Sequence, residues 1–326
     1  MTEKPIKVSI VVPLYNEKEN VPALLEEISA AMGPVDYRWE LILVDDGSTD
    51  GTVAILEELQ KGRPYMKVIE FRRNFGQTAA MAAGFNYAVG EVVVPMDGDL
   101  QNDPADVPRL AAKLEEGYDV VSGWRKKRKD KLFSRRIPSQ IANKLIGWIT
   151  QVKLHDYGCT MKAYRREVVN HLNLYGDMHR FIPALAQWSG ATVTEMEVNH
   201  RHRERGQTKY GLGRTLRVVL DLVTVKFLGT FSNRPLHFFG GIGLWTFLAS
   251  ILSGLVVVYM KFTSRSFQTP MNRNPLLILT VMLVIMSVQF LLMGLLAEMM
   301  CRTYHESQDK PTYVIRRIIE SEEEEG

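Results

Sequence analysis

The sequence predicts an α/β domain with a mostly parallel sheet, followed by a hairpin of two membrane-spanning helices. Short β-branched runs alternate with helical stretches over the first part of the chain. Such alternation is typical of a parallel sheet that is covered by helices on both faces. Farther along, the runs 235–260 and 274–297 contain 26 and 24 residues without a charged side chain. Because about 20 apolar residues span a bilayer, both runs are long enough to cross one.

Five runs rich in β-branched residues are expected to form buried strands. These strands are predicted at 7–12, 40–44, 66–71, 91–95 and 119–122. Between them, apolar residues recur at intervals of three and four, which indicates helices at 20–32, 51–60, 76–89 and 104–116. Ligands of such sheets bind at the carboxyl ends of the strands, so the turns that follow the strands are the candidate site.

Polar residues gather in the turns after three of these strands. Residues 13–17 (PLYNE) follow the first strand, 45–48 (DDGS) follow the second, and 97–99 (DGD) follow the fourth. Asp and Gly are common in turns of any kind, so one such turn would indicate nothing about function. Three acidic turns at one edge of a sheet predict a shared binding site.

The turn after the fourth strand is a candidate metal site. Only a glycine separates Asp97 from Asp99, so both carboxylates can turn toward one point, and Gln101 could add a neutral oxygen. Oxygen ligands suit a hard divalent cation, and Mg²⁺ usually shares its shell with substrate phosphates. A lone pair of this kind is weak evidence. The neighbouring carboxylates of Asp45 and Asp46 favour the metal interpretation.

Three other residues at this edge have both a functional and a structural interpretation. Tyr15 could stack on a nucleotide base or close the edge of the core. Arg72 and Asn74 precede a helix start, where free amides favour an anion, although simple helix capping explains them equally well.

Neither G-x-G-x-x-G nor G-x-x-x-x-G-K-[ST] occurs, which argues against a glycine-rich loop that binds dinucleotides or nucleoside triphosphates. With only Cys159 and Cys301, the chain is no disulfide-stapled secreted protein.

Three stretches in order, VVPLYNE, VDDGSTDGT and MDGDLQNDP, resemble the GT-A glycosyltransferases of the family-2 type. The resemblance covers roughly residues 6–210 and implies a Rossmann-like GT-A fold, a nucleotide-sugar donor and a divalent metal, Mg²⁺ or Mn²⁺. It assigns the donor to Pro13, Tyr15, Glu17, Asp45, Asp46, Arg72 and Asn74. It assigns the metal to Asp97, Asp99 and Gln101.

Two basic clusters predict an anionic acceptor at a membrane. Residues 125–136 include eight basic residues of twelve, and residues 200–205 read HRHRER. Such runs are usually solvated loops, localisation signals or nucleic-acid patches. Beside two membrane spans, lipid headgroups are the favoured partner, since each basic residue near an anionic bilayer contributes about 1 kcal/mol. Nucleic acid is therefore not expected as a partner.

A narrower resemblance rests on DYGCTMKAYRR, HRHRERGQTKYG and KPTYVIRRII. These stretches are similar to dolichol-phosphate-mannose synthases and, more closely, to bacterial undecaprenyl-phosphate glycosyltransferases, among which the formamido-arabinose transferases of lipid A modification are nearest. The resemblance implies inverting sugar transfer to a polyprenyl phosphate, with Asp156 as the catalytic carboxylate. A turn or helix-cap role is the alternative for Asp156. The residues assigned to the lipid phosphate are Arg125, Arg135, Ser139, Arg203 and Lys209.

The expected organisation has four parts along the chain. They are a GT-A domain at 1–211, an amphipathic interfacial helix within 212–234, a hairpin at 235–300 with spans at 235–260 and 275–297, and a cytoplasmic tail at 301–326. Four Lys or Arg flank the hairpin on each side and three lie in its loop, which predicts both termini in the cytoplasm and the enzyme in the cytoplasmic membrane. Glycines at 240, 241, 243 and 254 would permit close helix packing, including between subunits of a dimer or tetramer, or are tolerated bends.

Two other functions are compatible with parts of this pattern. A processive polysaccharide synthase would share the donor site, but it usually carries Q-x-x-R-W and more spans, and this sequence has neither. A non-catalytic pseudoenzyme or lipid-carrier binding partner would not need Asp97, Asp99 and Asp156. The sugar stays open among formamido-arabinose, glucose, N-acetylglucosamine and mannose donors, with the resemblance favouring the first.

Overall fold

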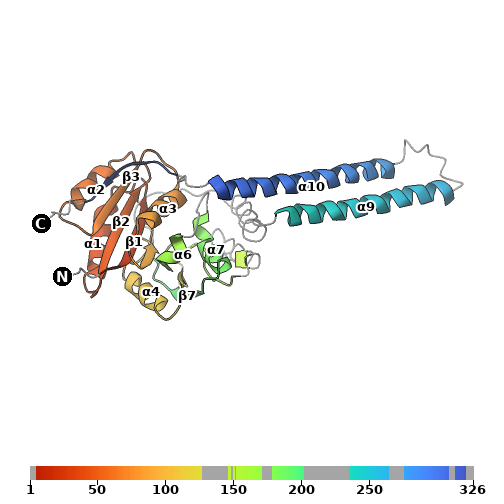
Figure 1. Cartoon of the computed structure of the whole chain (residues 1–326). Coiled ribbons are helices and arrows are strands. Elements are labelled where there is room, and N and C mark those ends of the chain that lie inside the picture. The colour runs from red at the N-terminus through yellow and green to blue at the C-terminus, as the bar shows by residue number, and fades with distance from the viewer. Residues whose placement is uncertain are drawn as a thin grey trace. The chain divides into compact units, whose positions relative to one another are not determined.

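The computed structural model describes residues 5–126, 146–147, 150, 152–170, 178–201, 235–263, 275–307 and 313–320. The chain divides into two compact units. One comprises Met1–Val225 together with Pro311–Gly326, and the other comprises Lys226–Lys310. The first unit is an α/β domain, and the second contains two long helices (Figure 1). The predicted amphipathic helix within 212–234 lies outside the described residues.

A mixed sheet of eight strands forms the centre of the α/β unit, in the order β7-β5-β6-β4-β1-β2-β3-β8. Its parallel centre consists of β4 (Val92–Pro95), β1 (Ile6–Leu14), β2 (Arg38–Asp45) and β3 (Met66–Phe71). With β5 (Val120–Trp124), these are the five strands that the sequence predicts. Their continuous apolar runs match burial on both faces, because helices cover both sides of a parallel sheet.

Three strands were not predicted, and two of them, β6 and β8, add antiparallel pairs to the predicted mostly parallel sheet. β6 (Lys162–Arg165) lies antiparallel between β4 and β5. β8 (Ile315–Ile319) pairs antiparallel with β3, whereas β7 (Val193–Glu197) runs parallel to β5. All three are short and carry charged residues, so they lack the long apolar runs that identified the other strands. β8 also places part of the predicted tail in the sheet.

Helices cover both faces of the sheet (Figure 1). One face packs against α1 (Val21–Met32), α2 (Thr52–Gln60) and α4 (Asp106–Leu114). The other packs against α3 (Gln77–Tyr87), α6 (Arg166–Asn170) and α7 (Ile182–Trp188), which follows the short helix η2 (Met178–Arg180).

Successive side chains of β1 pack alternately into the two hydrophobic cores of the domain. Ile10 and Val12 join the first cluster while Val11 joins the second, because successive side chains of a strand point to opposite faces. Each such side chain contributes roughly 2 kcal/mol on burial. The two cores together hold the carboxyl ends of the parallel strands in a fixed arrangement.

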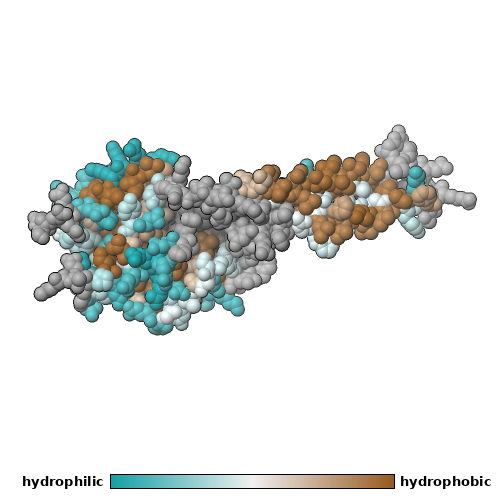
Figure 2. Space-filling view, viewed as in Figure 1, coloured by the Kyte–Doolittle hydropathy of each residue, from teal (hydrophilic) through white to brown (hydrophobic). Residues whose placement is uncertain are grey.

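The second unit pairs α9 (Pro235–Thr263) with α10 (Pro275–Ser307). Stretches Phe238–Phe262 and Pro275–Ala297 have mean hydropathies of 2.1 and 2.7 and are long and apolar enough to cross a membrane. Hydrophobic residues make up most of the visible surface of these helices (Figure 2), and Trp245 is 74% exposed. Soluble proteins rarely leave so large a continuous apolar surface in water, so lipid is its natural solvent.

One glycine of this hairpin is needed for close packing between the helices. A Cβ on Gly243 would lie 3.2 Å from the Ser287 carbonyl oxygen, whereas one on Gly241 would meet nothing within 4 Å. Thr280 Oγ1 donates a hydrogen bond of 2.9 Å to Ser253 Oγ across the pair. Small and hydroxyl-bearing residues therefore bring α9 and α10 together, which is typical of helix packing in membranes.

Candidate active site

The predicted polar turns meet at one edge of the sheet. Leu14, at the end of β1, pairs with Asp45, at the end of β2. Across the turns that follow, the backbone amide of Asn16 donates to Ser48 Oγ at 2.9 Å. On the other side of β1, the amide of Met96 donates to the Val11 carbonyl at 3.0 Å. The parallel register therefore brings the first, second and fourth turns side by side, as the sequence predicts.

Asp46 holds the loop that follows β3. Its carboxylate accepts hydrogen bonds from the backbone amides of Phe75 (2.6 Å) and Gly76 (2.9 Å). Burial raises the pKa of the Asp46 carboxyl, and these two hydrogen bonds oppose that rise. Gly47 has a φ of +70°, and a Cβ there would lie 2.5 Å from the backbone carbon of Arg73. The DDG turn and the loop 72–76 therefore form one tightly packed unit.

The side chains assigned to the donor differ in exposure. Arg72 and Asn74 are exposed in loop 72–76. Pro13, near the end of β1, and Tyr15 and Glu17, just after that strand, are half-buried. Glu17 Oε2 accepts a hydrogen bond of 2.6 Å from Asn20 Nδ2.

Asp45 has a different environment from these residues, since it exposes no surface. Its Oδ2 accepts from the Ser48 amide at 2.9 Å, and its Oδ1 has no hydrogen-bond partner within the part of the chain that the structure describes. Burial raises the pKa of the Asp45 carboxyl. Asp45 therefore stabilises the DDGS turn as a buried residue and presents no surface to a ligand.

The DGD turn is held by its own neighbours. Gln77 Nε2 donates to Asp97 Oδ1 at 2.9 Å, and the Asp97 amide donates to Asn102 Oδ1 at 2.8 Å. Asp99 Oδ1 accepts a hydrogen bond of 3.2 Å from the Gln101 amide. Across the described ranges, no cluster of three or more His, Cys, Asp or Glu could hold a metal by itself. Two half-buried carboxylates fit a cation whose remaining ligands are phosphate and water oxygens.

Arg125 and Asp156 form a buried ion pair at the end of β5. Arg125 Nε lies 2.7 Å from Asp156 Oδ2, and Nη2 lies 3.0 Å from Oδ1. The side chains are only 12% and 3% exposed. Burial disfavours the charged form of Arg125, but the Asp156 hydrogen bond and nearby charges, including Asp97, leave its pKa above the ordinary value. Asp97 therefore shares one electrostatic environment with the pair.

Gly158 makes room for this pair. A Cβ there would lie 3.3 Å from Arg125 Nη2 and 3.5 Å from Asp156 Oδ1, and its amide donates to Asp156 Oδ1 at 3.1 Å. The exposed Lys126, next in the basic run, instead pairs with Glu197. Arg125 is thus the described member of the run that faces the site. The predicted residues Arg135, Ser139, Arg203 and Lys209 lie outside the described residues.

The second basic cluster begins beside the DGD turn. The Arg201 amide donates a hydrogen bond of 2.9 Å to the Gln101 carbonyl, and Gln101 Nε2 donates to the Arg201 carbonyl at 3.4 Å. An isolated β-bridge joins Asn102 to His200. The Arg201 guanidinium binds Asp103 at 3.0 Å and Glu27 at 2.6 Å. Residues about 100 positions apart in the sequence are therefore adjacent here.

Two buried groups near the site were not predicted. Lys162 is fully buried, donates to the Cys159 carbonyl, and has a pKa lowered by burial. His179 Nδ1 lies 2.8 Å from Thr78 Oγ1, one residue after the Gln77 that binds Asp97, and burial lowers the pKa of His179 to about 3. Neither residue belongs to a recognisable spacing pattern, so the sequence alone does not identify it.

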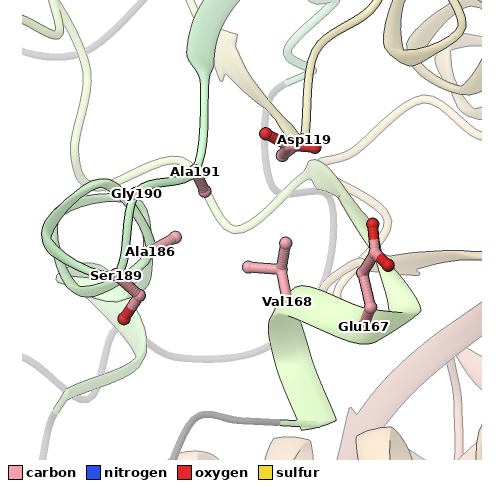
Figure 3. A pocket seen from close by; sticks show the side chains of 7 residues that line it. All are labelled: Asp119, Glu167, Val168, Ala186, Ser189, Gly190 and Ala191. Atoms are coloured by element: carbon pink, nitrogen blue, oxygen red, sulfur yellow. The ribbon is translucent and has the colours of Figure 1, made fainter.

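A separate cavity of about 330 Å³ lies at the opposite edge of the sheet (Figure 3). It is lined by Asp119, Glu167, Val168, Ala186, Ser189, Gly190 and Ala191. Asp119 precedes β5, whereas Arg125 follows it. The Asp119 carboxylate already accepts hydrogen bonds from the amide and hydroxyl of Thr192, both at 2.8 Å. This cavity therefore does not belong to the candidate active site.

Comparison with known proteins agrees with this geometry. Residues 9–172 match the family "Glycosyl transferase family 2". The chain is 45% identical to the dodecaprenyl-phosphate galacturonate synthase of Rhizobium johnstonii, over 97% of this chain and 94% of that relative. It is 37% identical to the undecaprenyl-phosphate 4-deoxy-4-formamido-L-arabinose transferase of Pseudomonas savastanoi pv. phaseolicola, over 99% and 94%.

A solved structure supports the fold. Glucosyl-3-phosphoglycerate synthase from Mycobacterium tuberculosis, in complex with Mn²⁺, UDP and glucosyl-3-phosphoglycerate, matches with a TM-score of 0.53. The match covers 68% of this chain and 80% of that one. Because the sequence identity is only 21%, the match supports the fold alone. With the family match and the two full-length relatives, the conclusion is that this chain belongs to glycosyl transferase family 2 and is a glycosyltransferase.

Proposed function

We propose that this chain transfers a sugar from a nucleotide-sugar donor to a polyprenyl phosphate at the cytoplasmic face of a membrane. The observation that carries the proposal is the buried Arg125–Asp156 pair at the carboxyl end of β5, on the sheet edge that also bears the DGD turn after β4. The same chain contains an apolar helical hairpin. Such a site can accommodate two phosphorylated substrates, since it combines carboxylates for a cation with a guanidinium for an anion. The names of the full-length relatives contain a polyprenyl phosphate and a sugar, which supports the same acceptor.

The donor would bind along the sheet edge formed by the turns after β1, β2 and β3. Tyr15 and Glu17, with Pro13, would line the base and ribose, and Asp46 would fix loop 72–76 beneath the nucleotide, with Asp45 buried behind it. Arg72 and Asn74 are exposed in that loop and would contact the donor's negative charge. Asp97 and Asp99, with Gln101, would hold Mg²⁺ or Mn²⁺. Such a cation neutralises a departing nucleoside diphosphate when it is bound.

The acceptor phosphate would bind Arg125. Asp156 uses two of the five guanidinium N–H groups, so the same side chain can still donate to a phosphate oxygen. A phosphate monoester has a second pKa near ~6, so its attacking oxygen is largely deprotonated at neutral pH and needs little help from a base. Asp156 would therefore act mainly by orienting Arg125 and the acceptor. Arg135, Ser139, Arg203 and Lys209 would complete the lipid-phosphate site.

Single displacement at the anomeric carbon would invert its configuration. The acceptor oxygen forms the new bond to that carbon while the bond to the nucleoside diphosphate breaks, and the diphosphate leaves with the electron pair. The arginines would offset the repulsion between the two anionic substrates, which is the larger electrostatic contribution expected in such a site. Transfer in one step requires no glycosyl-enzyme intermediate.

Chain connectivity supports a two-span topology. β8 follows the hairpin in sequence and belongs to the same sheet as the N-terminal strands. If both helices cross the bilayer, the N-terminal domain and β8 lie on the same side, as an even number of crossings requires. The excess of Lys and Arg on the flanks of the hairpin favours the cytoplasmic side for both. A processive synthase, with its additional spans, fits this arrangement less well.

The relatives suggest two sugars for the donor. The 45% identical relative is named for galacturonate and the 37% identical one for 4-deoxy-4-formamido-L-arabinose. Of these, the galacturonosyl donor is the first to test because its relative is the more similar. This ranking differs from the sequence-based preference for formamido-arabinose.

Product formation by the purified, detergent-solubilised chain tests the proposal. The chain is mixed with a panel of UDP-sugars, Mg²⁺ or Mn²⁺, and undecaprenyl phosphate, and the organic phase is analysed by mass spectrometry. We expect a polyprenyl-phosphate sugar from one donor and none after Asp97→Ala. A wild-type chain that binds UDP but yields no lipid-linked product with any donor would instead support a non-catalytic carrier-binding protein.

A further inference from the structure

We propose that β8, the strand after the membrane hairpin, and the residues just before it position the donor-binding loop 72–76, and that Tyr313, two residues before β8, is the principal positioning residue. The inference rests on the proposed function for what this loop binds, a nucleotide sugar. Its structural basis is independent of the acceptor. A segment near the end of the chain would then complete the site formed by the first quarter of the sequence.

The direction of β8 brings its first residues to the site. β8 runs antiparallel to β3, with Ile319 opposite Val68 and Ile315 opposite Phe71. The beginning of β8 therefore lies at the carboxyl end of β3, where the candidate site is. The pairing continues one step into the loop, because the Arg72 amide donates to the Val314 carbonyl at 3.1 Å.

Aromatic contacts extend this connection. Tyr313, which is 7% exposed, stacks on Phe71 with ring centroids 5.2 Å apart and planes 12° from parallel. Phe71 meets Phe75 edge-on at 5.7 Å. The Tyr313 hydroxyl accepts a hydrogen bond of 2.8 Å from Asn86 Nδ2 on α3. Tyr313 is thus fixed by an aromatic stack on one side and by a helix on the other.

The same loop is held from the opposite side by Asp46. The amides of Phe75 and Gly76 donate to the Asp46 carboxylate, and the Arg73 guanidinium lies 4.3 Å from the Phe75 ring centroid. Phe75 is therefore fixed between an aromatic contact with Phe71, which in turn stacks on Tyr313, and a hydrogen bond to Asp46, the residue after β2. Removal of the Tyr313 ring would take away the support behind Phe71 on one side of the loop and leave the Asp46 hydrogen bonds on the other side in place.

Elsewhere along β8, ion pairs hold the strand without touching the loop. Glu70 accepts hydrogen bonds from Arg316 (3.1 Å) and Arg317 (2.5 Å). Just after the last residue of β8, Glu320 Oε1 lies 3.4 Å from Lys67 Nζ. These contacts provide a matched control, since Glu320→Gln weakens the attachment of β8 at the end remote from the site.

Donor affinity in the full-length, detergent-solubilised chain tests the assignment. The variants are Tyr313→Ala, Tyr313→Leu, which keeps an apolar side chain, Tyr313→Phe, which keeps the stack, and Glu320→Gln. The Kd of UDP in the presence of Mn²⁺ is measured by calorimetry, alongside KM for donor and acceptor. Loss of a stacked aromatic contact is expected to raise the UDP Kd and donor KM about tenfold in the Ala and Leu variants.

The expected pattern separates positioning from general stability. Acceptor KM should stay unchanged in all variants, and Tyr313→Phe and Glu320→Gln should bind UDP like the wild type. Equal UDP affinity in wild type and Tyr313→Leu, or the same loss in Tyr313→Leu and Glu320→Gln, would overturn the assignment. Should Tyr313→Ala not fold, Tyr313→Leu decides. UDP binding without any lipid product in the wild type would contradict the proposed function but leave the Tyr313 test intact.

Discussion

Arg125 and Asp156 are joined by a two-point ion pair, with Nε 2.7 Å from Oδ2 and Nη2 3.0 Å from Oδ1. The pair is largely shielded from water. Breaking a buried pair by removing one partner leaves an uncompensated charge and typically costs about 3–5 kcal/mol. The chemistry assigned to either residue therefore depends on the other, and variants of both should behave as one unit.

Asp156→Asn tests this dependence. The amide removes the negative charge that orients Arg125, so kcat is expected to fall by about 10²-fold, with a smaller effect on donor KM. Steady-state kinetics with both substrates provides the measurement. Glu195→Gln is the control, because it removes a carboxylate that pairs with His155 rather than with Arg125. Unchanged kcat in Asp156→Asn would make the carboxylate a structural residue.

Much of the fold was predictable from the sequence because five strands consist of buried apolar runs. β6, β7 and β8 were not, since sequences such as KAYR and IRRII become strands only through pairing with distant neighbours. The site was partly predictable for the same reason, since its turns follow predicted strands. Which residue of the basic run faces the site depends on the contact between Arg125 and Asp156, which spacing alone does not indicate.

Asp97→Ala and Asp99→Ala should abolish transfer and leave membrane insertion intact. Each removes one of two carboxylates proposed to hold the cation, and one carboxylate with an amide is a poor site for Mg²⁺ or Mn²⁺. Product assays across a range of Mn²⁺ concentrations, with carbonate extraction of membranes, measure both properties. Glu116→Gln, at an exposed pair with Lys113, is the control. Near-normal turnover without divalent metal would exclude the metal assignment.

Gly47→Ala should disturb the donor site more than Gly62→Ala does. Both glycines have a positive φ, +70° and +79°, but only at Gly47 would the new Cβ meet backbone within 4 Å. The shared conformational cost is about 1 kcal/mol, and the clash with Arg73 adds to it. Thermal unfolding and UDP titration compare the two variants. Equal effects would show that the close approach of the DDG turn to loop 72–76 is unimportant.

His179 should make stability depend on pH in the acidic range. Its pKa is lowered to about 3 by burial, whereas an unfolded histidine titrates near ~6.5. Between these values the unfolded state binds a proton that the folded state excludes, so stability falls as pH decreases, by up to about 1.4 kcal/mol per pH unit. Thermal unfolding from pH 7 to pH 4.5 measures the slope.

His179→Asn should flatten that slope, while His155→Asn, at an exposed histidine, should not. Asn can still hydrogen-bond to Thr78, so the comparison isolates the proton. An identical slope in the wild type and His179→Asn would contradict the burial of a neutral imidazole at this position.

The central claim is that the DGD turn and the Arg125–Asp156 pair bind the cation and the acceptor phosphate within one site. Paramagnetic broadening of the ³¹P resonance of a short-chain polyprenyl phosphate by Mn²⁺, in the presence of UDP, measures this proximity. Strong broadening in the wild-type chain that disappears in Asp97→Ala is the predicted result. A sharp resonance in the wild-type chain, with both Mn²⁺ and the lipid phosphate bound, would contradict it.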